Sequence, residues 1–337
     1  MTTQSSPSSL GTVLVTGAGG AAAVTLLRSL AGHAELVAAD IDPVAVGLYL
    51  TDASRRVLLP RGDSPDFVDA LLAAAVAHHA DLVAPTVDAE LLEVSLAADR
   101  FAEHGIRVLV ESPDTLRTCL DKSTLMQRCA GRVRVPQSLV LDGATTDAEL
   151  AALGAPFIVK PRSGAGGRGF RVVAGPGELT DADRAGDVLA QELLPGDEYS
   201  IDVLCRPGGG VVAAVPRRRD KVDSGIAVAG RTVADPALET FGREVAELIG
   251  AQGVVNVQVK LDAEGSAALL EVNARFPGTM ALTQAAGIDM PLLAVRAAFG
   301  EPLPERLDFR EVAVVRHWGD VVVPIDEYGL VPSHDGR

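Results

Sequence analysis

Residues 255–275 read VNVQVKLDAEGSAALLEVNAR, two largely apolar runs joined by the short stretch DAEG at 262–265. This pattern predicts a β-hairpin with a tight turn. Side chains along a strand alternate between its two faces, so the valines of the first run share one face and its polar residues share the other. Pairing of the two strands would gather a single polar row, namely Asn256, Gln258, Lys260, Glu271, Asn273 and Arg275.

This polar row offers the oxygen ligands that Mg²⁺ prefers, together with cations suited to phosphate. Alternating polar residues are equally ordinary on the solvent face of an antiparallel sheet. The hairpin alone therefore leaves two interpretations open, a metal-binding face and a solvated surface.

The composition is that of a soluble globular protein with more than one subdomain. The chain has 337 residues, of which 47% are hydrophobic and only 4% aromatic. This length fits about two or three α/β subdomains. A net charge of −15 argues against non-specific binding of nucleic acid, because the protein would repel a polyanion.

Several features predict a cytoplasmic protein without a membrane span. The cysteines Cys119, Cys129 and Cys205 are scattered and lack the spacing of a metal site or a CxxC pair, which indicates reduced thiols. Residues 1–10 lack the basic start and apolar core of a signal peptide, so we expect a flexible tail. No apolar run approaches the roughly 20 residues that span a bilayer.

Strands and helices alternate through the first third of the chain. An apolar strand at 12–16 is followed by the glycine turn GAGG, a helical run at 21–30 and a second strand at 35–39. Alternation of this kind continues to residue 110 and predicts a parallel sheet with helices on both faces. We therefore expect a Rossmann-like α/β domain over residues 11–112.

The glycine turn raises the hypothesis of a nicotinamide cofactor. Gly17 and Gly19 match the first two glycines of GxGxxG, Ala22 stands at the third, and Asp40 lies where a ribose ligand is expected. Glycines at these positions also simply permit a tight turn and close helix packing. We favour this second interpretation because a more complete nucleotide site follows. Asp88, after a later strand, is typical of a helix N-cap.

Two lysines and a glycine-rich loop mark the next part of the chain. Lys122 lies in the first turn of a predicted helix, where a cation opposes the helix dipole, so a phosphate partner and a solvated surface are both open. Lys160 ends an apolar strand and directly precedes the loop RSGAGGRG at 162–169. Backbone amides of such a loop can fold over phosphate oxygens, although the GxxxxGK[ST] pattern of a P-loop is absent.

Polar residues also follow the predicted strand at 188–193. Gln191 and Glu192 can present an amide and backbone groups to an adenine edge, and Glu198 can present a carboxylate to ribose hydroxyls. Taken singly, each is as ordinary as a surface residue. Further on, RRRDK at 217–221 is either a solvated loop or an anion clamp, and a last pair of strands is expected at 312–316 and 321–324.

In their order and spacing these motifs resemble the ATP-grasp superfamily. The resemblance is greatest to the branch that contains the synthetase domains of carbamoyl-phosphate synthase and related carboxylate–amine ligases. It covers most of the chain and implies a two-subdomain ATP-grasp fold, α+β in character, after the N-terminal domain. Residues 113–194 would form the small lid subdomain, and residues 195–337 the large subdomain with the metal site and C-terminal strands.

The resemblance implies a set of nucleotide-binding residues. The two lysines would contact the phosphates, the glycine loop would close over the γ-phosphate, the linker would bind adenine, and one glutamate would bind the ribose. These residues are Lys122, Lys160, Ser163, Gly164, Gly166, Gly167, Gln191, Glu192, Leu194 and Glu198.

The resemblance also implies the reacting centre. Gln258, Glu271 and Asn273 match the Mg²⁺ positions, which Mn²⁺ can also occupy. Many members have a carboxylate at the first of these positions; the glutamine here lowers the negative charge of the site and leaves the number of metals open. Arg275 matches the arginine that stabilises the transferring phosphoryl group, and Lys160 would assist it.

The implied reaction is ATP-dependent ligation of a carboxylate to an amine through an acyl-phosphate. The substrates would be small molecules, an amino acid or a peptide-like compound, and dimers are common in such families. A single ATP-binding module argues against a complete carbamoyl-phosphate synthase. Two alternatives stay open, an ATP-binding sensor or scaffold and an NAD-dependent oxidoreductase that uses the glycine turn. Candidates for the specificity pocket are Arg217, Ser224, Gly225, Arg231 and Arg316.

Overall fold

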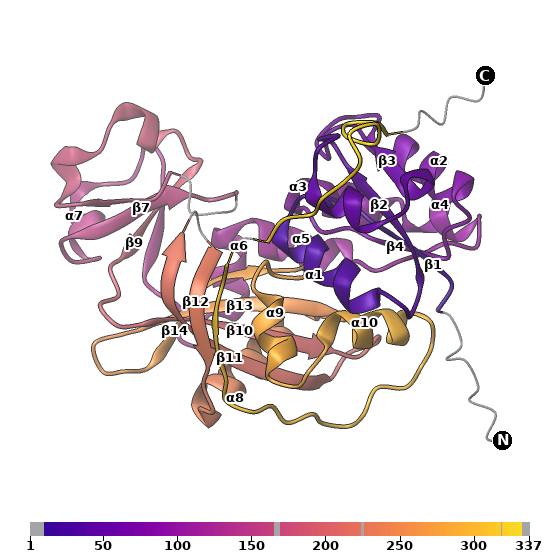
Figure 1. Cartoon of the computed structure of the whole chain (residues 1–337). Helices are drawn as coiled ribbons and strands as arrows, with labels where there is room; N and C mark the ends of the chain where they lie inside the picture. The colour runs from indigo at the N-terminus through magenta and orange to yellow at the C-terminus, as the bar shows by residue number, and fades with distance from the viewer. Residues whose placement is uncertain (1–9, 165–168, 224–225, 318, 332–337) are drawn as a thin grey trace.

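The computed structural model describes residues 10–164, 169–223, 226–317 and 319–331. Three sheets organise these residues, one in each of three lobes (Figure 1). In the described residues, no helix is long and apolar enough to cross a membrane.

The N-terminal lobe is the expected parallel α/β domain. Its five-stranded sheet has the order β3-β2-β1-β4-β5, and every pairing is parallel. The strands are continuous apolar runs because helices cover both faces. The elements are β1 Thr12–Val15, α1 Ala21–Leu30, β2 Glu35–Asp40, β3 Arg56–Leu58, α2 Phe67–Ala77, β4 Leu82–Ala84, α3 Asp88–Leu96, α4 Ala98–Ala102 and β5 Arg107–Val108.

The lid lobe is a small antiparallel sheet in the order β6-β9-β7-β8. Two short helices lead into it, and they pack their apolar faces on the large subdomain instead of on the lid. The loop after β7 carries the glycine-rich motif. The elements are α5 Pro113–Leu120, α6 Lys122–Cys129, β6 Ser138–Leu141, α7 Asp147–Ala151, β7 Phe157–Pro161, β8 Arg171–Val173 and β9 Val188–Glu192.

The large subdomain is built on a six-stranded antiparallel sheet in the order β14-β13-β10-β11-β12-β15. The predicted hairpin forms β13 and β14 at one edge of this sheet, and α8 packs on β10 and β11. The elements are β10 Glu198–Cys205, β11 Val211–Asp223, β12 Ile226–Thr232, α8 Pro236–Leu248, β13 Val254–Leu261, β14 Ala267–Asn273, α9 Met280–Ala285, α10 Met290–Ala298 and β15 Ala313–Val315.

The expectation of two C-terminal strands is half wrong. Residues 313–315 pair with β12 as β15, but residues 321–324 are irregular, and Val322 is 94% exposed. The chain leaves the sheet after β15 and crosses to the N-terminal domain (Figure 1), so no strand lies beside this segment to form a ladder. There Tyr328 stacks on Tyr49 with ring centroids 6.5 Å apart, and Glu327 pairs with buried Arg56 at 2.8 Å.

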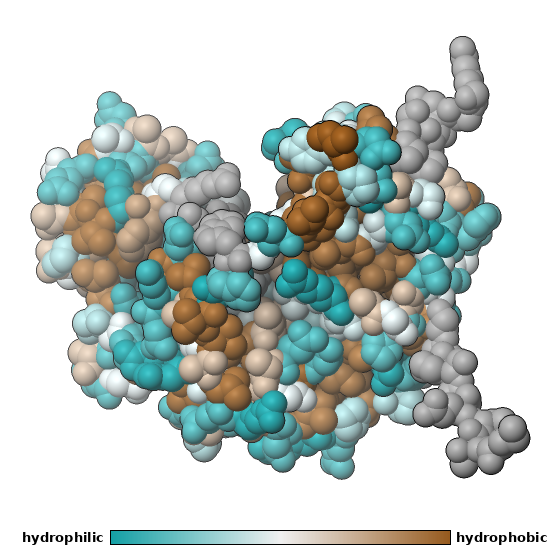
Figure 2. Space-filling view, viewed as in Figure 1, coloured by the Kyte–Doolittle hydropathy of each residue, from teal (hydrophilic) through white to brown (hydrophobic). Residues whose placement is uncertain are grey.

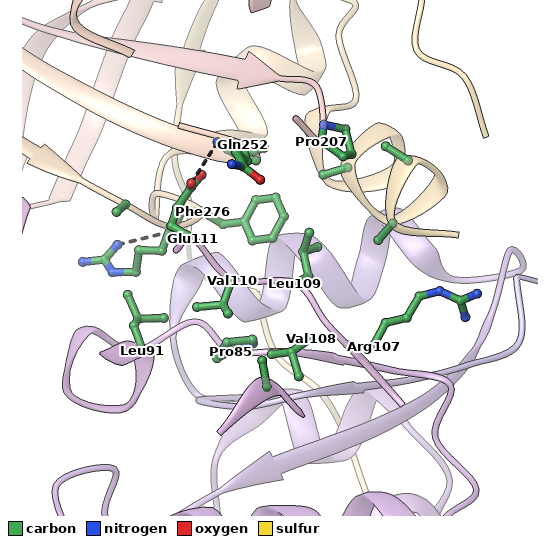
Figure 3. A pocket seen from close by; sticks show the side chains of 18 of the residues that line it. Pro85, Leu91, Arg107, Val108, Leu109, Val110, Glu111, Pro207, Gln252 and Phe276 are labelled. Carbon is green, nitrogen blue, oxygen red and sulfur yellow. Dashed lines mark hydrogen bonds between the residues drawn. The ribbon is translucent and has the colours of Figure 1, made fainter. Parts of the chain in front are cut away.

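A cavity of about 600 Å³ lies where the N-terminal domain meets the large subdomain. The segment 107–111 lines one side, and Gln252 and Phe276 lie opposite it (Figure 3). Glu111 is buried here and accepts a hydrogen bond from the Gln252 backbone amide at 2.8 Å. Burial raises the pKa of Glu111 to about 7, an effect that this hydrogen bond only partly offsets.

The raised pKa of Glu111 predicts a pH-dependent stability. The folded protein holds this proton more tightly than the unfolded chain, so the contribution to stability is full below about pH 4.5 and is lost as the pH rises through about 7. Glu111→Gln cannot ionise, so its melting temperature relative to wild type should rise between pH 5 and pH 8, by about 2–5 °C. Glu93→Gln, on the exposed side of α3, is the control. A difference that stays constant with pH would contradict this role.

Candidate functional site

The polar row of the hairpin forms as predicted. In the β13–β14 register, Asn256 lies opposite Asn273 and Gln258 lies opposite Glu271. The register shifts only after Gln258, where a bulge leads toward the turn. The three expected metal ligands therefore lie next to one another on one face, at the edge of the sheet nearest the lid (Figure 1). We call these three residues, Gln258, Glu271 and Asn273, the metal row.

Both predicted lysines meet this face. The Lys122 Nζ lies 3.8 Å from a carboxylate oxygen of Glu271 and donates to the Gly164 carbonyl at 2.9 Å, which ties the start of the glycine loop to the metal row. Lys160 is buried, and burial lowers its pKa to about 8; the neighbouring charge of Lys122 lowers the pKa further, while Glu271 opposes the shift.

The adenine candidates are placed differently from one another. The Oε1 atom of Gln191, which we expected to meet an adenine amino group, accepts from Lys160 at 2.9 Å. Its Nε2 atom is buried without a partner among the described residues. The Glu192 carboxylate instead accepts from Arg134 at 2.7 Å, and Leu194 is buried. This region therefore offers an unpaired amide donor.

The ribose candidate Glu198 has a partner that the sequence did not reveal. It forms an ion pair with Arg219 of β11. Glu198 begins β10, which pairs with β11 along the sheet, and the antiparallel register brings these two positions of the chain together. The basic run RRRDK is thus part of a strand, and its third arginine orients the glutamate.

Arg275 is held by a residue that we had interpreted only as a helix cap. Its Nε and a terminal nitrogen donate to the two oxygens of Asp88 at 2.7 and 2.6 Å. Asp88 is the first residue of α3, and Val87 occupies the cap position. A bidentate pair of this kind fixes the plane of the guanidinium. The only sequence signal for it was the position of Asp88 after a parallel strand.

The other candidates divide into buried, exposed and undescribed residues. Ser163 pairs with Asp121 in an isolated bridge, whereas Gly166 and Gly167, like Ser224 and Gly225, lie outside the described residues. Arg217 is only 1% exposed and binds Asp202, so it supports the site from beneath instead of lining a pocket.

Two further arginine candidates lie on or beside the strands next to β11. Arg231 is an exposed residue of β12 that faces Asp220 at 3.9 Å. Arg316 is half-buried and donates to the Gly278 carbonyl. Burial lowers the pKa of Arg316, and the charge of Arg217 lowers it further. Arg316 therefore lies close enough to Arg217 to feel its charge, whereas Arg231 lies opposite Arg218 and turns toward Asp220.

The glycine turn of the N-terminal domain is closed by the protein itself. The Gly19 amide donates to Asp40 at 2.7 Å, and the Ala18 and Gly20 amides bind backbone carbonyls at 3.1 and 2.8 Å. A Cβ at Gly47 would come within 2.2 Å of the Ala18 carbonyl oxygen, so this segment covers the turn closely. The amides that would hold a dinucleotide pyrophosphate are thus already used.

The donor set of the hairpin suits Mg²⁺. Glu271 supplies a carboxylate, and Gln258 and Asn273 supply amide oxygens, which are hard ligands. Within the described residues no group of three or more His, Cys, Asp or Glu gathers as a metal site. Any metal on this face would therefore depend on amide oxygens.

Comparison with known proteins identifies the fold. Residues 184–321 match the family model described as ATP-grasp in the biosynthetic pathway with Ter operon. The chain therefore carries an ATP-grasp region over residues 184–321. Its N-terminal part, residues 13–109, matches the PylC-like N-terminal domain. This confirms the ATP-grasp resemblance and the predicted fold class, and it places the hairpin inside the ATP-grasp module.

Solved structures share this fold at low sequence identity. Biotin carboxylase from Campylobacter jejuni, in complex with an ATP analogue, is 20% identical with a TM-score of 0.73, over 87% of this chain and 72% of that chain. N5-carboxyaminoimidazole synthetase from Staphylococcus aureus, complexed with ADP, is 16% identical with a TM-score of 0.72, over 88% and 79%. Both of these structures contain a bound adenine nucleotide.

The lowered pKa of Lys160 predicts how nucleotide affinity depends on pH. Phosphates bind the protonated amine, so the affinity for ADP should be flat below about pH 8 and fall above it, by about tenfold from pH 7 to pH 9. Calorimetric titration of ADP over this range measures the effect. Lys160→Arg should remove the pH dependence because a guanidinium stays charged. An affinity that does not change up to pH 9 in wild type would contradict the assignment.

Proposed function

We propose that this ATP-grasp protein is a ligase that phosphorylates a carboxylate with ATP and couples the resulting acyl-phosphate to an amine, releasing ADP and phosphate. One observation carries the proposal: Lys122 and buried Lys160, from different segments, converge on Glu271 in the oxygen-rich row of the hairpin. Phosphoryl transfer needs cations for the phosphates and oxygen ligands for Mg²⁺ in one confined space.

The chain assigns a separate role to each group. Lys160 and Lys122 bind the phosphates, and Glu198, held by Arg219, receives the ribose hydroxyls. Gln258, Glu271 and Asn273 would hold Mg²⁺ or Mn²⁺, which when bound would neutralise the charge that develops on the phosphoryl oxygens. The two hydrogen bonds to Asp88 fix the plane of the Arg275 guanidinium. In this orientation the guanidinium would stabilise the acyl-phosphate on its other side.

The shape of the molecule supports a reaction that excludes water. The lid and the N-terminal domain form separate lobes above the large subdomain, with an open notch between them (Figure 2). The Lys122 contact with Gly164 anchors the start of the glycine loop beside the metal row. Closing of the lid over bound nucleotide would protect the acyl-phosphate from hydrolysis.

The substrate class follows from the cations that remain near the site. Arg316, which is half-buried beside β15, carries a positive charge to which a substrate carboxylate would be attracted, whereas Arg231 faces Asp220. We propose an amino acid or peptide-like acid and an amine as substrates. The three cysteines are buried free thiols, which suits a protein of the reducing cytoplasm. A homodimer stays a prediction.

Loss of Glu271 tests the chemistry of the site. We expect Glu271→Ala to lower ADP formation by about 100-fold or more, because the only carboxylate of the metal row is removed. The fold should survive because Glu271 is partly exposed on an edge strand. Coupled-enzyme detection of ADP measures the effect, and Glu264→Ala in the exposed hairpin turn is the matched control. Undiminished turnover would remove Glu271 from the site.

A substrate screen distinguishes the ligase from the two alternatives. Phosphate release should appear with one pair among amino acids and small acids, and mass spectrometry should detect an amide product. A protein that is stabilised by Mg-ATP yet forms ADP with no pair would be a sensor or scaffold. Thermal stabilisation by NAD and not by Mg-ATP would overturn the ligase proposal.

A further inference from the structure

A buried carboxylate beneath the metal row fixes a chain of hydrogen bonds. Asp202 is fully buried; its Oδ1 accepts from Arg217 at 2.5 Å and from the Asn256 Nδ2 at 2.8 Å, and its Oδ2 accepts from Thr283 at 2.5 Å. The Oδ1 atom that accepts from the Arg217 guanidinium also accepts from the Asn256 amide nitrogen, because a carboxylate oxygen meets an amide through its NH₂ group. Asn256 must therefore turn its NH₂ group toward Asp202.

The orientation of the Asn256 amide in turn sets the orientation of the Gln258 and Asn273 amides. Its oxygen faces away from Asp202 and accepts from the Gln258 Nε2 at 3.3 Å and the Asn273 Nδ2 at 3.4 Å. The register allows this because Asn273 lies directly opposite Asn256 and Gln258 follows on the same face. Gln258 and Asn273 each donate to Asn256 through the side-chain nitrogen, so the side-chain oxygen of each residue faces away from Asn256.

The two amide oxygens are left available. In the part of the chain that the structure describes, neither Gln258 Oε1 nor Asn273 Oδ1 accepts a hydrogen bond from the protein. A carboxylate presents an oxygen whichever way it is rotated, whereas a rotated amide presents an NH₂ group that repels a cation. The two amide ligands of the metal row therefore need neighbouring residues that fix the rotation of each amide group.

We propose that Asp202 and Asn256 are positioning residues that hold the amide oxygens of Gln258 and Asn273 toward the metal. The inference rests on the proposed function, because it concerns the same Mg²⁺ site. It also gives the buried Arg217 a role: its hydrogen bond to the Asp202 Oδ1 holds the carboxylate in place beneath Asn256. Groups behind a metal ligand commonly change metal affinity by about 10–100-fold.

The first experiment measures how much Mg²⁺ strengthens ADP binding. Calorimetry on the full chain, with Mg²⁺ and with EDTA, gives the ratio of the two affinities. Asn256→Leu should lower this ratio by about tenfold or more and leave metal-free ADP binding unchanged. Ser95→Ala, which removes a buried hydrogen bond on α3 of the N-terminal domain, is the control and should keep the wild-type ratio. Asn256→Ala replaces the leucine variant if that variant does not fold.

The second experiment tests orientation itself. In the background Gln258→Glu with Asn273→Asp, both ligands are symmetric carboxylates, so Asn256→Leu should change the Mg²⁺ ratio by less than about threefold. An equal loss in both backgrounds would show that Asn256 acts by packing and would overturn the inference. So would an unchanged ratio in Asn256→Leu alone. If Mg²⁺ did not change the ADP affinity of the wild-type protein, the proposed function would be overturned as well.

Discussion

The structure depends on two buried lysine cations that share one carboxylate. Lys122 and Lys160 come from separate segments and are less than 10% exposed, yet among the described residues Glu271 is the one carboxylate that offsets their charge. Burying a cation without a full counter-charge is costly, and the cost shows in the lowered pKa of Lys160. A polyanion that enters this space offsets the excess positive charge, so the same constraint favours nucleotide phosphates.

The three lobes are connected through charged side chains that also belong to the site. Arg275, at the end of the metal hairpin, is bound by Asp88 of the N-terminal domain, while Lys122 holds the backbone of the lid loop at Gly164. The N-terminal domain and the lid are thus each joined to the region of the metal row by one charged side chain. The cavity beside Phe276 and Glu111 (Figure 3) adjoins this connection, because Arg275 is one of its lining residues.

The N-terminal domain illustrates how one motif can serve two purposes. Gly17 and Gly19 have the spacing of a dinucleotide site, and Gly17 adopts a positive φ of 61° that favours glycine. Asp40, which the pattern would assign to a ribose, instead accepts from the Gly19 amide. The turn is satisfied internally and serves to pack α1 against the sheet.

The sequence by itself determined the local features. Period-two alternation specified the row of Gln258, Glu271 and Asn273, and continuous apolar strands specified the parallel N-terminal sheet, because both depend on neighbouring residues. Only the tertiary structure decided that Asp88 binds Arg275, that Arg217 lies buried on Asp202, and that residues 321–324 form no strand. Those outcomes join segments up to 187 positions apart, and such partners are set by how the lobes pack, which no local pattern records.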